Sequence, residues 1–181
     1  MSTNHAPRIA VVGSLNMDLV LQVQHAPGPG ETVLADALHL VPGGKGGNQA
    51  VACARQGARV ALFGRVGNDG YGHTLRAGLD ADGIDHSGVQ TDTDTTTGVA
   101  AITVEATGQN RIVVVPGANG RFVLDAAALG AALQGAGGLV LQFETPLPQV
   151  LAAAEMAHAA GCPVVRSEEH TSELQSPDHL V

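Results

Sequence analysis

Short aliphatic and β-branched runs alternate with alanine-rich stretches along this chain, and that alternation limits the folds open to it. Runs that read as buried strands lie at 8–14, 58–67, 138–144 and 163–165. Stretches with helical composition lie at 48–56, 69–84, 123–134 and 147–161. Strands separated by helices pair in parallel, and the helices then cover the sheet. The sequence therefore predicts an α/β protein with a doubly wound parallel sheet as its core.

Two segments depart from this alternation and instead show the period of two typical of strands with one exposed face. The first covers about residues 17–41, with strands expected at 18–24 and 31–41 around the turn HAPGPG. The second covers about residues 97–115, with two strands around the turn ATGQN. We expect both to form a small β lid over the carboxyl edge of the parallel sheet. Such a lid can close on a ligand and keep water out, as kinases of small molecules require.

Composition excludes several classes of partner. Of the 181 residues 44% are hydrophobic and 14% charged, which suits one globular domain. A formal charge of −8 and only 2% aromatic residues argue against nucleic acid. No apolar run is long enough for a signal peptide or a membrane span, so we expect a cytoplasmic protein without a membrane partner. Cys53 and Cys162 lie far apart and, like the scattered histidines, show no metal-ligand spacing, so no metal site is expected.

The segment VPGGKGGNQAVACARQGA, residues 41–58, crowds four glycines around Lys45. Phosphate is the obvious ligand for such a loop, because glycines let backbone N–H groups approach an anion. The spacing does not fit, since a P-loop needs Gly where His39 stands and Ser or Thr where Gly46 stands. A dinucleotide fingerprint fails as well, because its third glycine would replace Gln49. The loop is therefore expected to hold another kind of ligand.

Polar side chains that suit hydroxyl groups gather at strand ends and in the glycine loop. They are Asn16, Asp18, Lys45, Asn48 and Glu144. Asn both donates and accepts, the carboxylates accept hydroxyl protons, and lysine donates without needing an anion. Lys45 is the single lysine of the chain, which favours a functional role over a place on a solvated surface.

Ordinary structural roles remain open for several of these residues. Asn16 and Asp18 could cap a turn after a strand, and Glu144 could be a first-turn carboxylate of the helix that follows Pro146. The segment 67–70 reads as a turn and a helix cap, with ligand contact as the less favoured alternative.

On its motifs, the chain resembles the PfkB family of carbohydrate kinases, and the ribokinase branch in particular. The pattern Gly-Gly-x-Gly-x-Asn-x-Ala from Gly43, with Gly57 and Gly67 after it, matches the first signature of that family. Further carriers are GSLNMD (13–18), PGPGET (27–32), VGNDGYG (66–72), TTGVA (96–100), PGAN (116–119) and LQFETPL (141–147). Residue 47 is Gly where ribokinases usually have Ala, which should only loosen the loop. The resemblance covers 8–165 and implies a ribokinase-like fold of which residues 1–165 are the amino-terminal part.

The resemblance also implies roles for individual residues. Those implied to contact sugar hydroxyls are Asn16, Asp18, Gly44, Lys45, Asn48 and Glu144, and lid residues Ala101 and Val114 are implied to pack on the apolar face of the sugar. Within the family, ribose is favoured as the substrate over phosphosugars or nucleosides. The residues that favour it are Asn16, Asp18, Gln49 and the segment 144–146. A family kinase for another sugar or nucleoside and a stand-alone sugar-binding module remain the alternatives.

The implied activity is ATP-dependent phosphorylation of ribose to ribose 5-phosphate. The family's cofactors are ATP, Mg²⁺ and a monovalent cation such as K⁺. We also expect the lid to form a homodimer in the intact enzyme, because the apolar alternation in DLVLQV and VAAITV would otherwise leave an apolar face and open strand edges exposed. The nucleotide site and the catalytic Asp belong to a second signature, Gly-Ala-Gly-Asp, which this sequence lacks. No acid in the chain is therefore expected to act as the base, and the chain alone is expected to be inactive.

The end of the chain, RSEEHTSELQSPDHLV (166–181), breaks the pattern directly after a predicted strand. Its composition is polar and acidic, and no further strand or helix can be discerned. It reads like the translation of a sequencing-library adapter oligonucleotide. We therefore expect residues 166–181 to be a non-native tail joined to a truncated gene, with a natural charged tail as the alternative.

Overall fold

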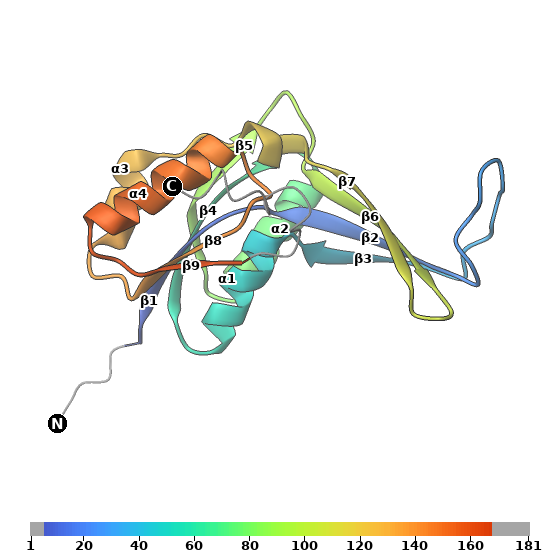
Figure 1. Ribbon diagram of the computed structural model, residues 1–181, viewed down its shortest axis with the longest axis horizontal. Coiled ribbons are helices and arrows are strands. Elements are labelled where there is room, and N and C mark those ends of the chain that lie inside the picture. Colours follow the sequence, from blue (N-terminus) through green and yellow to red (C-terminus); the bar gives the residue numbers. More distant parts are fainter. Residues whose placement is uncertain (1–5, 168–181) are drawn as a thin grey trace, which may run out of the picture.

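A computed structural model describes residues 6–167. Its core is a five-stranded, all-parallel sheet in the order β5-β4-β1-β8-β9 (Figure 1). The strands are β1 (Arg8–Val12), β4 (Arg59–Gly67), β5 (Asp85–Asp92), β8 (Gly138–Leu141) and β9 (Val164–Arg166). The four predicted core strands are present, and β5 was missed.

Helices cover both faces of this sheet. They are α1 (Lys45–Arg55), α2 (Gly70–Ala81), α3 (Ala126–Leu133) and α4 (Leu147–Ala159). One hydrophobic cluster joins α1 and α2 to one face through residues such as Ala50 and Leu75. The other joins α3 and α4 to the opposite face through residues such as Leu129 and Ala153. The expected doubly wound architecture is confirmed.

The order of the strands creates a point where the chain reverses direction along the sheet. From β1 the chain first adds β4 and β5 on one side, and only later β8 and β9 on the other. The connections that leave the carboxyl ends of β1 and β8 therefore diverge. In parallel α/β sheets such a switch point leaves a crevice in which ligands bind.

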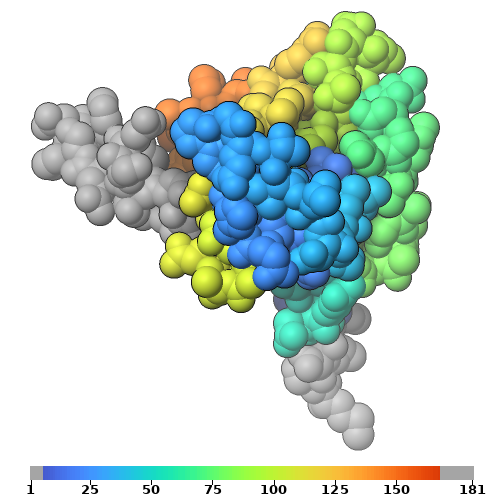
Figure 2. Space-filling view, turned by 90° about the vertical axis from the view of Figure 1, so that its right-hand side faces the viewer, coloured from blue at the N-terminus to red at the C-terminus, as the bar shows by residue number. Residues whose placement is uncertain are grey.

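The lid is one four-stranded sheet with the order β3-β2-β6-β7. Its strands are β2 (Asn16–Val23), β3 (Ala37–Gly43), β6 (Gly98–Glu105) and β7 (Asn110–Val115). The two predicted hairpins are joined by parallel pairing of β2 with β6. The sheet extends from one side of the core in Figure 1, and Figure 2 looks at it from that side, with the β2–β3 connection in front. A short 3-10 helix, η1 (Gly117–Arg121), leads from β7 back to the core.

Several element boundaries differ from the predictions, and three of them concern the glycine loop, the lid and the end of the chain. Helix α1 begins at Lys45 rather than Asn48, so the glycine loop is itself the first turn of the helix. Strand β3 begins at Ala37, so residues 31–36 belong to the connection. Arg166 is the last residue of β9 and its guanidinium lies 5.2 Å from the ring centroid of Phe143, so the strand runs one residue into the segment expected to be non-native. Most of that segment, residues 168–181, lies outside the described residues.

Candidate functional site at the switch point

Glu144 lies at the crevice between β1 and β8 and is the centre of a small polar cluster. The hydroxyl of Ser14 donates to Glu144 Oε2 at 2.6 Å, and the backbone N–H of Lys45 donates to the same oxygen at 3.2 Å. Lys45 Nζ lies 3.4 Å from Glu144 Oε1. The side chains of Lys45 and Glu144 are 21% and 30% exposed, so both still reach solvent. The cluster can present a cation and a carboxylate to a ligand at the same place.

The glycines of the loop allow α1 to start against the end of β1. Gly44 has φ +84°, which favours glycine, and a Cβ there would lie 2.7 Å from Asn16 N. A Cβ on Gly46 would lie 2.5 Å from the backbone carbon of Gly13. The backbone N–H of Gly47 donates to Ser14 O at 2.9 Å. Close backbone packing therefore explains these glycines, and it brings Lys45 to Glu144.

Asp18 approaches the same cluster from the lid. It lies on β2, where a Cβ added to Gly43 of the neighbouring strand would meet its carboxylate. Burial raises the pKa of Asp18, and the negative charge of Glu144 raises it further. The two carboxylates are therefore close enough for one charge to act on the other, although they are more than 120 positions apart in the chain.

The remaining predicted residues lie around this cluster in different environments. Gly44 is the buried N-cap of α1. Asn16 is only 5% exposed, and its Oδ1 accepts a hydrogen bond from Asn119 Nδ2 at 2.8 Å. Asn48 is exposed and follows Lys45 by three positions on α1, so the two lie on the same side of the helix.

The two predicted lid contacts lie on opposite faces of the lid. Strand pairing aligns Asp18 with Ala100, and Ala100 with Val114, so these three side chains share one face. Ala101 pairs with Leu19 and Val113 on the other face. The expected sugar contact of Val114 is compatible with this register. The expected contact of Ala101 is not, because successive side chains on a strand point to opposite faces and Ala101 lies one residue away from the face of Asp18. Ala100 takes its place beside Asp18.

Two residues of the cluster were missed as site residues. Ser14 is fully buried against Glu144, and Asn119 is 1% exposed against β2. Ser14 lies in the motif GSLNMD and Asn119 in the motif PGAN. A polar side chain among apolar neighbours was the sequence feature that could have identified each as a site residue. The prediction of a turn and a helix cap at 67–70 is confirmed, because Asp69 is the N-cap of α2 and accepts from Gly72 N at 2.8 Å.

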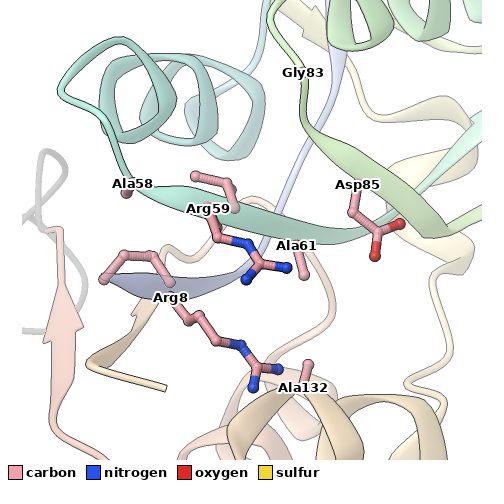
Figure 3. Close-up of a pocket in the computed structure, with 9 residues that line it drawn as sticks. Arg8, Ala58, Arg59, Ala61, Gly83, Asp85 and Ala132 are labelled. Atoms are coloured by element: carbon pink, nitrogen blue, oxygen red, sulfur yellow. The ribbon is translucent and has the colours of Figure 1, made fainter. Parts of the chain in front are cut away.

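A second hollow lies at the opposite, amino-terminal edge of the parallel sheet (Figure 3). It has a volume of about 300 Å³, and Arg8, Arg59 and Asp85 line it together with glycine and aliphatic residues. None of the candidate residues belongs to it. Among residues 6–167 no group of three His, Cys, Asp or Glu is placed to hold a metal ion, and no helix is long and apolar enough to cross a membrane.

Comparison with known proteins decides the family. The profile of the pfkB family carbohydrate kinases matches residues 6–179. The chain belongs to this family of carbohydrate kinases. It is 41% identical over 159 residues to the ribokinase of Bacillus subtilis, covering 87% of this chain and 54% of that protein. It is 39% identical over 166 residues to the ribokinase of Schizosaccharomyces pombe, covering 87% and 52%.

A solved PfkB-type fold agrees with this assignment. The structure of Arabidopsis thaliana ribokinase complexed with ribose and ATP superposes with a TM-score of 0.78 at 32% identity, over 89% of this chain and 53% of that one. The chain thus spans about half the length of the relatives it matches. The fold and the family are those expected from the motifs.

Proposed function

We propose that this chain is the sugar-binding part of an ATP-dependent ribose kinase, with the sugar held between the lid and the glycine loop. The observation that carries the proposal is the convergence of Asp18, Lys45 and Glu144 at the switch point, from strand β2, helix α1 and the loop after β8. Two carboxylates accept protons from neighbouring hydroxyls, and the lysine donates to a sugar oxygen. Similarity to ribokinases supports ribose among the possible sugars.

The lid supplies the other half of the binding surface. Ala100 and Val114 share the face of Asp18, and they offer apolar contact to the carbon–hydrogen face of a sugar ring. Polar groups at the floor and apolar groups in the lid suit a polyol, which has both kinds of surface. Closing the lid would remove water from the reacting hydroxyl.

In the proposed reaction the primary hydroxyl of ribose attacks the γ-phosphorus of ATP. The new bond joins that oxygen to phosphorus, the bond from phosphorus to the β,γ-bridging oxygen breaks, and a base takes the hydroxyl proton. We assign no residue of this chain as that base. Asp69 in particular caps α2, and both of its carboxylate oxygens already accept hydrogen bonds. The described residues contain no group of three His, Cys, Asp or Glu that could hold a metal ion, and no step is assigned to Mg²⁺ or K⁺. By itself the chain is proposed to bind sugar without transferring phosphate.

Isothermal titration of ribose into the 181-residue chain tests the proposal. The chain should bind ribose, and Asp18→Asn should weaken binding by roughly ten- to a hundredfold, because a hydrogen bond to a charged group contributes about 1.5–3 kcal/mol. Asp36→Asn, on the exposed β2–β3 connection, is the matched control and should bind like wild type. Equal binding by all three proteins, or none by wild type, would contradict the proposed site.

The alternatives are separated by two further measurements. Titration with a panel of sugars and nucleosides distinguishes ribose from other substrates of the family. Incubation with ATP, Mg²⁺, K⁺ and ribose distinguishes a sugar-binding fragment from a complete kinase, because phosphate transfer by this chain would show that our placement of the base is wrong. A cytoplasmic location remains part of the proposal and can be tested by fractionation.

The lid is also proposed to form a homodimer. On the face opposite Asp18, Leu38 and Leu40 are 56% and 53% exposed, and Val113 is 68% exposed. Exposed apolar side chains on a sheet with open edges favour association. A second lid could cover this face while the other face holds the sugar.

A further inference from the structure

The side chain of Asn119 makes three hydrogen bonds, although no functional role has been assigned to this residue so far. It lies in η1, directly after the lid strand β7, and is 1% exposed. Its Oδ1 accepts from Leu15 N at 2.9 Å, and its Nδ2 donates to Leu15 O at 3.0 Å. The same Nδ2 donates to Asn16 Oδ1 at 2.8 Å. The side-chain amide thus pairs with the backbone of Leu15 as a peptide group would, and also holds a candidate site residue.

These contacts determine which way each amide group points. The backbone N–H of Leu15 can only donate, so the atom of Asn119 facing it must be the oxygen. The NH₂ group of Asn119 therefore faces Leu15 O and Asn16. Because that NH₂ group can only donate, Asn16 must present its oxygen to it. The NH₂ group of Asn16 is consequently left for other partners, and residues 6–167 provide no hydrogen bond to it.

Gly98 makes room for this pair of amides. It begins β6 and pairs with Asn16 across the lid sheet. A Cβ on Gly98 would lie 2.2 Å from Asn119 Nδ2 and 2.3 Å from Asn16 Oδ1, the two atoms joined by the hydrogen bond. The absence of a side chain here therefore allows the amides to meet under the lid.

We propose that Asn119 is a positioning residue of the sugar site, which holds the Asn16 amide so that it offers only N–H groups to a bound sugar. The inference rests on the proposed function. It adds a rule of recognition: the sugar atom opposite Asn16 must be an acceptor oxygen, whereas those opposite Asp18 and Glu144 must be hydroxyls that donate. The same contact attaches η1, the segment that follows lid strand β7, to Asn16 at the base of the site.

Two variants test the proposal in the 181-residue chain. Asn119→Asp keeps the acceptor for Leu15 N but removes both donated hydrogen bonds. Gly98→Ala keeps every polar group and separates the two amides sterically. Each should weaken ribose binding by roughly three- to tenfold, the range expected for one lost neutral hydrogen bond. If Asn119→Asp fails to fold by circular dichroism, Gly98→Ala decides.

Matched controls separate this effect from general damage. Asn110→Asp makes the same chemical change at an exposed lid position, and Gly78→Ala adds a methyl group where nothing lies within 4 Å. Both should bind ribose like wild type. Binding by Asn119→Asp and Gly98→Ala that also matches wild type would overturn the proposal.

Hydrogen exchange and chemical shifts of the Asn side-chain NH₂ groups, followed by ¹⁵N NMR, give a further test that a change in stability alone would not mimic. In wild type the Asn119 NH₂ group should exchange slowly with or without ribose, while the Asn16 NH₂ signals should shift when ribose is added. In Gly98→Ala the Asn16 response should weaken. If the Asn119 NH₂ group exchanges as fast as that of exposed Asn110, the amide orientation is wrong regardless of ribose. Slow Asn119 exchange without any response to ribose would instead overturn the sugar site itself, and the positioning role with it.

Discussion

Removal of the Asp69 carboxylate should loosen the lid as well as the helix that this residue caps. Asp69 Oδ1 accepts from Gly72 N at 2.8 Å, which caps α2. The same oxygen accepts from Thr97 Oγ1 at 2.7 Å, and Oδ2 accepts from Thr97 N at 2.7 Å. Thr97 is fully buried and directly precedes the lid strand β6. Asp69→Ala therefore removes a helix cap and two attachments of the lid at once.

The size of the effect follows from these contacts. Loss of an N-cap costs about 1 kcal/mol. Each hydrogen bond from Thr97 to a charged acceptor contributes about 1.5–3 kcal/mol, reduced here because Asp69 is partly exposed and water can replace some of the lost contact. We expect Asp69→Ala to lower the free energy of unfolding by about 3 kcal/mol, a large part of the 5–15 kcal/mol typical of a domain.

Asp125→Ala is the matched control, because Asp125 caps α3 and its carboxylate accepts a hydrogen bond from Ala128 N of the same helix rather than from the lid. Urea unfolding followed by circular dichroism should give a loss of about 1 kcal/mol for Asp125→Ala. The difference between the two variants, about 2 kcal/mol, measures the attachment of the lid. Equal losses would show that the bonds to Thr97 contribute nothing and would refute the reasoning.

The pH dependence of that difference is a second test. Burial raises the pKa of Asp69, but hydrogen bonds from Gly72, Thr97 and Tyr71 outweigh burial and hold this pKa below its usual value. A carboxyl with a depressed pKa in the folded state contributes stability above its unfolded-state pKa, and the contribution disappears as the pH falls through the folded-state pKa. The gap between wild type and Asp69→Ala should therefore be full at neutral pH and shrink only in acid.

Further predictions address the site, the association state and the tail. Burial and the charge of Glu144 raise the folded-state pKa of Asp18, so its ionised form costs stability at neutral pH, and Asp18→Asn should raise the urea midpoint at pH 7 while weakening ribose binding. Gly46→Ala, where a Cβ meets backbone at 2.5 Å, should cost about 1–3 kcal/mol, whereas Gly78→Ala should cost nothing. Sedimentation of an intact enzyme with this lid, at micromolar concentration, should show a dimer, and a monomer would argue against the lid interface. Codons from Arg166 onward should match an adapter oligonucleotide, and any other codons would refute the adapter origin.

The elements predicted correctly are those whose signal is local. The lid hairpin of β6 and β7 alternates apolar residues around a turn, and Asp69 precedes a helical pattern as an N-cap does. Strand β5 was missed because its sequence, DHSGVQTD, is mostly polar and only Val89 and Asp92 are buried. An edge strand needs no second apolar face, since only one neighbour and one packed helix cover it.

The start of α1 and the facing of the lid side chains depend on tertiary structure. Gly46 and Gly47 have poor helix propensity, yet they are helical because the absence of side chains lets the first turn pack on Ser14. The face on which Ala101 lies is set by the register of β6, and that register depends on the pairing of β6 with β2. The sequence of β6 does not reveal this pairing, so the prediction put Ala101 beside the sugar. Composition of β6 alone is compatible with either face, because its sequence, GVAAITVE, has apolar residues at successive positions and therefore on both faces.

The contacts that assemble the candidate site join residues far apart in sequence, which is why motifs revealed its members but not their arrangement. Ser14 and Glu144 are 130 positions apart, and Leu15 and Asn119 are 104 apart. Asp69 holds the entry of the chain into β6, and Asn119 holds its return from β7, so both ends of this hairpin are fixed beside Asn16. The base of the lid is therefore part of the rigid core, and a closing motion has to come from bending of the lid strands beyond these attachments. Such bending would carry Ala100 and Val114, and with them Asp18, toward the glycine loop while leaving Lys45 and Glu144 in place.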